Sequence, residues 1–90
     1  MTAKHALRRV QALAIAGRVV FSRHGDEERL DEMASEEEIV EALIFSRSCL
    51  WNRDHETWNV DTRIDLTVAV VFDTTAAGEV VLVVTVFGRS

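Results

Sequence analysis

The apolar positions in the first half of the chain recur with a helical period. In residues 3–16 they fall on one face, and Gly17 follows at the position where helices commonly end. A second apolar stripe runs through residues 36–46, and Ser35 and Glu38 have the spacing of a capping box at its start. The pattern therefore predicts helices over both ranges.

The stretch between these two helices is rich in acids and predicts a further, shorter helix. Residues 18–22 form a β-prone or extended link, and the helix is expected to run from about Asp26 to Ala34. The carboxylate of Asp26 can cap its first turn, and acids in that turn suit the helix dipole. With this start, His24 lies on the preceding loop.

The second half of the chain changes to the pattern of β-strands. Residues 63–72 alternate apolar and other side chains, residues 73–78 predict a turn, and residues 79–87 are apolar on both faces. A strand that is apolar on both faces is expected in the middle of a sheet. Shorter strands are expected at residues 50–51 and 58–60, on either side of a loop.

Length and composition agree with one globular domain. The 90 residues are 48% hydrophobic and 28% charged, unlike a disordered chain. Helices followed by strands predict a single α+β domain over residues 1–90, with N-terminal helices packed on a small antiparallel sheet that ends in a long β-hairpin. No apolar run reaches the roughly 18 to 20 residues that cross a bilayer. With no secretory signal pattern and Cys49 as its single cysteine, the protein is expected in the cytoplasm, without membrane contact.

The charges are distributed unevenly along the chain, whose formal net charge is −5. Residues 1–23 carry five basic residues and no acid, whereas residues 24–45 carry nine acids against Arg29. Charge blocks of this kind mark interaction surfaces in some proteins and are merely solvated helix faces in others. Both readings stay open at this point.

Three short motifs, in this order, resemble a known family of small toxin domains. They are GRVVFSRH from Gly17, the capped helix SEEEIVEAL from Ser35, and the closing strand VVLVVTVFGRS from Val80. The arrangement is similar to BrnT-type toxins, which are related in fold to RelE-type ribonucleases and to the tRNA-cleaving tails of some bacteriocins. The resemblance in order covers residues 17–90.

The resemblance implies RNA cleavage without a metal or cofactor. In that chemistry His24 would transfer a proton, Arg29 would stabilise the charge of the phosphorane, and Thr85 would orient the phosphate. Further candidates for phosphate binding are three other arginines: Arg23, Arg63 and Arg89. Each residue also fits an ordinary role, because histidines near helix starts often cap or pack, and threonine is common in strands.

The acids near His24 favour an alternative hypothesis, because they repel incoming phosphate. The chain would then be a non-catalytic module, of the kind encoded by phages or mobile elements, that binds a basic host protein through residues 26–41. The residues expected to make this contact are Glu36, Glu37 and Glu38, with Trp51 and Trp58 as aromatic anchors.

Other expectations concern partners and metals. The partner is RNA or a protein, either an antitoxin or a basic host protein. The apolar strand 79–87 must be central or covered by a second subunit, so a homodimer is an open alternative. No metal site is expected at residues 53–56, because consecutive Asp, His and Glu cannot all reach one ion.

Overall fold

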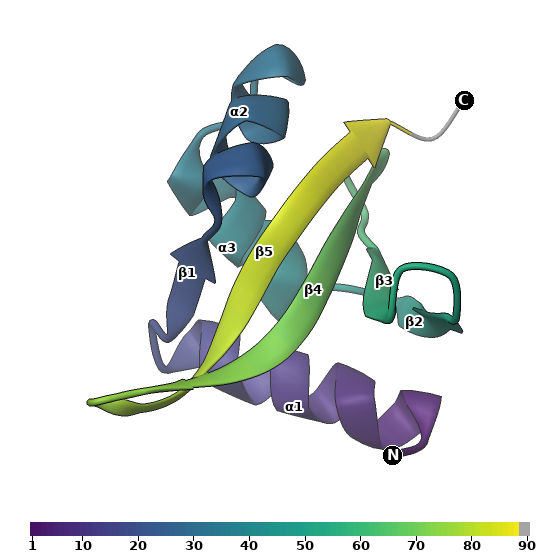
Figure 1. Cartoon of the computed structure of the whole chain (residues 1–90). Helices are drawn as coiled ribbons and strands as arrows, with labels where there is room; N and C mark the ends of the chain where they lie inside the picture. The colour runs from purple at the N-terminus through teal and green to yellow at the C-terminus, as the bar shows by residue number, and fades with distance from the viewer. Residues whose placement is uncertain (89–90) are drawn as a thin grey trace.

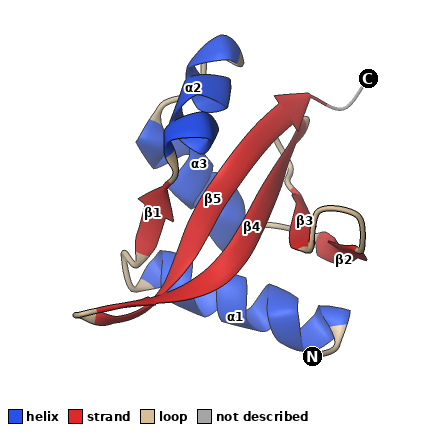
Figure 2. Ribbon diagram, viewed as in Figure 1, coloured by secondary structure: helices blue, strands red, loops and turns tan. Residues whose placement is uncertain are grey.

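A computed structural model describes residues 1–88, in which the helices precede the main strands as the hydrophobic pattern predicts (Figures 1 and 2). Residues 1–88 form three helices and five strands. In chain order the elements are α1 (Ala3–Ile15), β1 (Val19–Phe21), α2 (Arg23–Asp31), α3 (Glu36–Ile44), β2 (Ser48–Asn52), β3 (Thr57–Asp61), β4 (Leu66–Thr75) and β5 (Gly78–Gly88). The predicted α+β fold, with N-terminal helices on a sheet that ends in a long hairpin, is confirmed.

The five strands form one sheet in the order β1-β5-β4-β3-β2. Strand β1 pairs with β5 in parallel, and the other three pairings are antiparallel. Strand β5 therefore has neighbours on both sides, which confirms the inner position predicted from its apolar faces. This strand needs no second subunit to cover its backbone.

One face of the sheet carries the main core. Helices α1 and α3 lie together on this face, behind β4 and β5 in the view of Figure 1. The side chains that fill the space between them are almost all aliphatic and fully or nearly buried: Ala6, Val10, Ala14, Ile39, Leu43, Val60, Val68, Val70, Val81, Val83 and Val86. Because alternate residues of a strand point to opposite faces, the residues between these valines lie on the other face.

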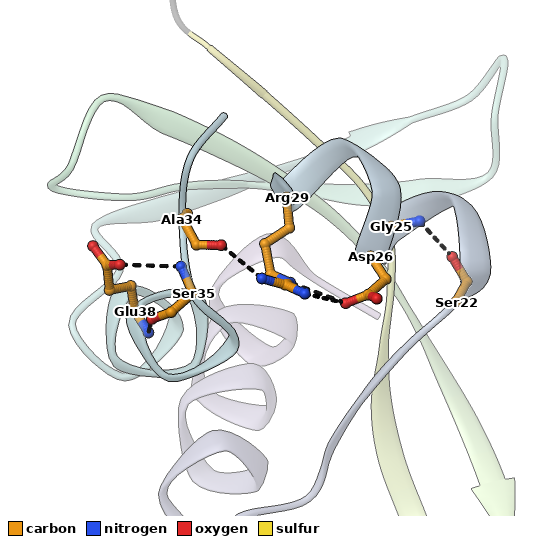
Figure 3. A network of polar contacts seen from close by, with 7 residues as sticks. All are labelled: Ser22, Gly25, Asp26, Arg29, Ala34, Ser35 and Glu38. Atoms are coloured by element: carbon orange, nitrogen blue, oxygen red, sulfur yellow. Dashed lines mark hydrogen bonds and ion pairs between the residues drawn. The ribbon is translucent and has the colours of Figure 1, made fainter. Parts of the chain in front are cut away.

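Two helix ends are as the sequence predicts. Helix α1 stops before Gly17, which adopts φ 73°, a conformation that glycine tolerates without strain. At the start of α3 the Ser35 hydroxyl accepts a hydrogen bond from the Glu38 backbone N–H, and the Glu38 carboxylate accepts one from the Ser35 N–H, each at 3.0 Å. This confirms the capping box (Figure 3).

The predicted start of α2 is wrong by about one turn. The helix begins at Arg23, and Ser22 caps it by accepting a hydrogen bond from the Gly25 N–H at 2.9 Å (Figure 3). His24 is therefore in the first turn of the helix, not on the loop before it. Ser22 and Asp26 are both residue types that cap helices, and Asp26 instead pairs with Arg29 further along the helix.

The hairpin strands are shifted relative to the prediction. Strand β4 begins at Leu66 because the Thr62 hydroxyl and N–H both donate to the Leu66 carbonyl oxygen, which closes a short loop with Asp65 at φ 60°. At the other end β4 continues to Thr75. The two strands are joined by only the two residues between Thr75 and Gly78, where a six-residue turn was expected.

Helix α2 covers the edge of β5 beyond the point where β1 ends. The Ser22 N–H donates to the Val83 carbonyl oxygen at 2.9 Å, and the Gly88 N–H donates to the Glu32 carboxylate at 2.9 Å. Between these two contacts, Gly25 lies so close to β5 that an added Cβ would be 2.3 Å from the Val83 carbonyl oxygen. A β-bulge lies beside this contact, because Ala69 pairs with Thr85 and the next residue pairs with Val83.

We predict that Gly25→Ala destabilises the protein by about 2 kcal/mol or more, because the new methyl group meets a backbone carbonyl that is fixed in the sheet. Alanine would otherwise stabilise a helix interior by roughly 0.5–1 kcal/mol relative to glycine. Chemical denaturation of the two proteins measures the difference. Glu27→Ala, at an exposed position of the same helix, is the control and should change stability by less than about 0.5 kcal/mol. A stabilising effect of Gly25→Ala would contradict the packing described here.

Candidate functional site

A groove of about 560 Å³ lies on the face of the sheet opposite α1 and α3. Its floor contains Asn59, Ala69 and Thr85, which are direct neighbours across β3, β4 and β5. The residues next to them, Val60 among them, point into the main core, so the floor residues face away from it. Ala69, in the middle of the floor, is nearly buried.

Two histidines from distant parts of the chain line this groove. His24 comes from the first turn of α2, and His55 comes from the turn between β2 and β3. Helix α2 covers the β5 edge of the three-stranded floor, and the turn lies at the start of β3. The two histidines are far apart in the sequence, and the pairing of the strands brings them to the same groove.

The turn that carries His55 is organised by a side chain. The Asn52 side-chain oxygen accepts hydrogen bonds from the N–H groups of Asp54 and His55, at 3.1 and 3.3 Å. Glu56 completes the turn with φ 53°, in the left-handed region that is uncommon for residues other than glycine. An asparagine followed by a tight turn is a recognisable signal, but sequence analysis considered His55 only as a metal ligand.

The groove carries little charge. Its remaining lining consists of Asn52, Thr57, Val84 and Phe87. Among residues 1–88, no carboxylate and no lysine or arginine lines it, so the two histidines are its ionisable groups. The surface is mostly apolar, with amide and hydroxyl groups placed between apolar patches.

Three acids of α2, which argued against phosphate binding, each have a basic neighbour on the same helix. Asp26 pairs with Arg29 at 2.6 Å and Glu27 with Arg23 at 3.4 Å. The Glu28 carboxylate lies 3.7 Å from Nε2 of His24. These pairs offset much of the negative charge beside His24, so the repulsion expected from the sequence is reduced.

Arg29 lies on a different side of α2 from His24. Its guanidinium donates to the Asp26 carboxylate at 2.6 and 3.0 Å and to the Ala34 carbonyl oxygen at 2.9 Å (Figure 3). The side chain is only 12% exposed, and its cationic end lies 5.9 Å from the centre of the Phe21 ring. Because five residues rotate a helix by about 500°, His24 and Arg29 diverge by about 140°. Arg29 thus holds α2 to the segment before α3 and does not line the groove.

Two of the other candidate arginines, Arg23 and Arg63, are also outside the groove. Arg23, in the first turn of α2, is 95% exposed and contacts Glu27. Arg63 donates to the Phe45 carbonyl oxygen at 3.0 Å, in a separate hollow beside α3. Arg89 lies outside the described residues. Of the predicted catalytic and phosphate-binding residues, the structure therefore brings His24 and Thr85 together.

The residues predicted to bind a protein partner fall on two separate surfaces. Glu36, Glu37 and Glu38 are exposed in the first turn of α3. Glu36 and Glu37 border the hollow beside β1, whereas Glu38 lines a different hollow with Arg63. Trp51 and Trp58 lie in β2 and β3, at the opposite edge, with their ring centres 5.1 Å apart. Trp58 is buried and Trp51 is half exposed.

Other chemistries find no support among residues 1–88. Burial raises the pKa of the Cys49 thiol above its ordinary value, and the thiol donates to the Ala3 carbonyl oxygen at 3.2 Å, so it is a packed side chain and not an activated nucleophile. The described part of the chain has no group of three or more His, Cys, Asp or Glu side chains placed to hold a metal ion. Within the same part, each helix is too short or too polar to span a bilayer.

Comparisons with protein-family models, with curated proteins and with solved structures find no match to this chain.

We predict that Arg29→Ala lowers the free energy of unfolding by about 2 kcal/mol, because it removes several hydrogen bonds of a nearly buried cation. Thermal or chemical denaturation measures this loss. Arg23→Ala, which removes an almost fully exposed arginine from the same helix, is the matched control and should leave stability within about 0.5 kcal/mol. Equal stability of the two variants would contradict the structural role of Arg29.

Proposed function

We propose that this protein is a small metal-independent ribonuclease of the toxin type, which binds single-stranded RNA in the groove and uses His24 for proton transfer. The observation that carries the proposal is that His24 and Thr85, from α2 and β5, line one groove on the open face of the sheet. Both histidines, His24 and His55, line this groove together with uncharged polar side chains.

The lining of the groove suits an unpaired nucleotide. Unstacked RNA bases are commonly bound by stacking on aromatic side chains and by hydrogen bonds to their polar edges. Phe87 is 40% exposed in the groove and offers an aromatic surface, and Asn52 and Asn59 offer amide groups. A duplex hides these base edges, so single-stranded RNA is the better substrate.

The phosphate would be bound by dipoles and histidines more than by arginines. The hydroxyl group of Thr85 is a hydrogen-bond donor in the groove, and His24 adds a positive charge when protonated. The first turn of α2 contributes the positive end of a helix dipole next to His24. The exposed side chain of Arg23, held by a single contact with Glu27, is within the same turn and can follow the RNA backbone.

We predict that expression of the wild type in a bacterial host arrests growth and fragments total RNA, and that His24→Ala abolishes both effects. The variant should retain its stability within about 1 kcal/mol, because the side chain is 65% exposed. Electrophoresis of total RNA and thermal unfolding measure the two properties. His5→Ala, at an exposed histidine of α1, is the matched control and should act like the wild type. Full RNA cleavage by His24→Ala would contradict this role for His24.

A second candidate function has its own structural observation. Glu36, Glu37 and Glu41 border an apolar hollow formed by β1 and α3, whose floor includes Phe21 and Val40. An apolar floor with an acidic rim suits a basic protein segment that carries an apolar anchor. Intact RNA and normal growth on expression of the wild type would favour this binding function over the ribonuclease.

A further inference from the structure

Cleavage of RNA by its own 2′-hydroxyl requires two proton transfers. A base removes the proton of the 2′-hydroxyl while the oxygen attacks phosphorus, and an acid protonates the 5′-oxygen that leaves. His24 alone supplies one of these groups in the proposed ribonuclease. Histidine is the side chain that changes its charge near neutral pH, and the other histidine of the groove is His55.

We propose that His55 is the second proton-transfer residue of this site, and this inference rests on the ribonuclease function proposed above. His24 and His55 both line the groove, His24 from α2 at the β5 edge and His55 from the turn before β3, and the floor between these elements contains Asn59, Ala69 and Thr85. In the proposed complex the phosphate of a nucleotide on this floor lies between the two imidazoles. The attacking and leaving oxygens of an in-line displacement also lie on opposite sides of phosphorus.

The surroundings of the two histidines suggest how the roles divide between them. The Glu28 carboxylate lies 3.7 Å from Nε2 of His24, where it can pair with an imidazolium. His24 takes the role of the acid that donates to the leaving oxygen. His55, on the turn fixed by Asn52, takes the role of the base that accepts the proton of the 2′-hydroxyl.

The reaction balances without another reactant. The bond between the 2′-oxygen and phosphorus forms as the bond between phosphorus and the 5′-oxygen breaks. His55 gains the proton of the 2′-hydroxyl, and His24 gives its proton to the 5′-oxygen. The products are an RNA that ends in a 2′,3′-cyclic phosphate and an RNA that begins with a 5′-hydroxyl.

The test uses two short RNA substrates that differ only in the leaving atom. One has the natural 5′-oxygen at the cleavage site, and the other has sulfur in its place, which leaves as a thiolate and needs no acid. On the natural substrate we expect His24→Ala and His55→Ala each to lower the cleavage rate by about 10² to 10⁴-fold. On the sulfur substrate His24→Ala should cleave within about tenfold of the wild type, whereas His55→Ala should stay as slow as before.

The pH dependence provides a second readout that a structural role would not produce. The wild-type rate on the natural substrate should rise and then fall with increasing pH, because the base must be neutral and the acid protonated. His55→Ala should lose the rise on the acidic side, and His24→Ala should lose the fall on the alkaline side. His55→Asn repeats the test with a polar side chain, and thermal unfolding checks that the variants are folded.

The outcomes separate the two proposals. Cleavage by the wild type together with a wild-type rate and pH profile in His55→Ala would overturn the role of His55 and leave the ribonuclease function intact. Recovery of His55→Ala, and not of His24→Ala, on the sulfur substrate would reverse the two assigned roles and so contradict the assignment. No cleavage of either substrate by the wild type would overturn the ribonuclease function and the role of His55 with it.

Discussion

The close packing of Gly25 against the Val83 carbonyl oxygen determines where α2 lies, and the position of α2 determines one wall of the groove. Only a residue without a side chain permits this approach, since a Cβ would be 2.3 Å from that oxygen. Ser22 caps the helix at the same point and bonds to the same carbonyl, so the helix start and its docking are one feature. His24 and Thr85 meet in the groove because this contact and the adjacent bulge place them there.

Charge is kept largely outside the groove. The basic side chains of α1 surround a separate hollow, and Arg9 is paired with Glu79 near the turn of the hairpin. Glu36, Glu37 and Glu41 of α3 border the hollow beside β1. Asp26, Glu27 and Glu28 of α2 have basic neighbours on their own helix. These acidic side chains therefore lie outside the lining of the groove.

The sequence predicts the parts of the fold that depend on local pattern. The helical period gives α1, the capping box at Ser35 gives α3, and the apolar residues of β5 give its inner position. The start of α2 could not be predicted, because two capping residues compete and the packing of Gly25 decides between them. The resemblance named His24 and Thr85, which both line the groove, whereas His55 comes to the groove only through strand pairing and so could not be found from local pattern.

The most direct test of RNA binding in this groove is nuclear magnetic resonance of the labelled protein with a short single-stranded RNA whose 2′-hydroxyls are methylated. Methylation blocks cleavage, so the complex persists during the measurement. Binding as proposed shifts the signals of His24, His55, Asn59 and Thr85 at RNA concentrations where the basic face of α1 is unaffected. Shifts confined to α1, or no shifts at all, would contradict an RNA site on the open face of the sheet.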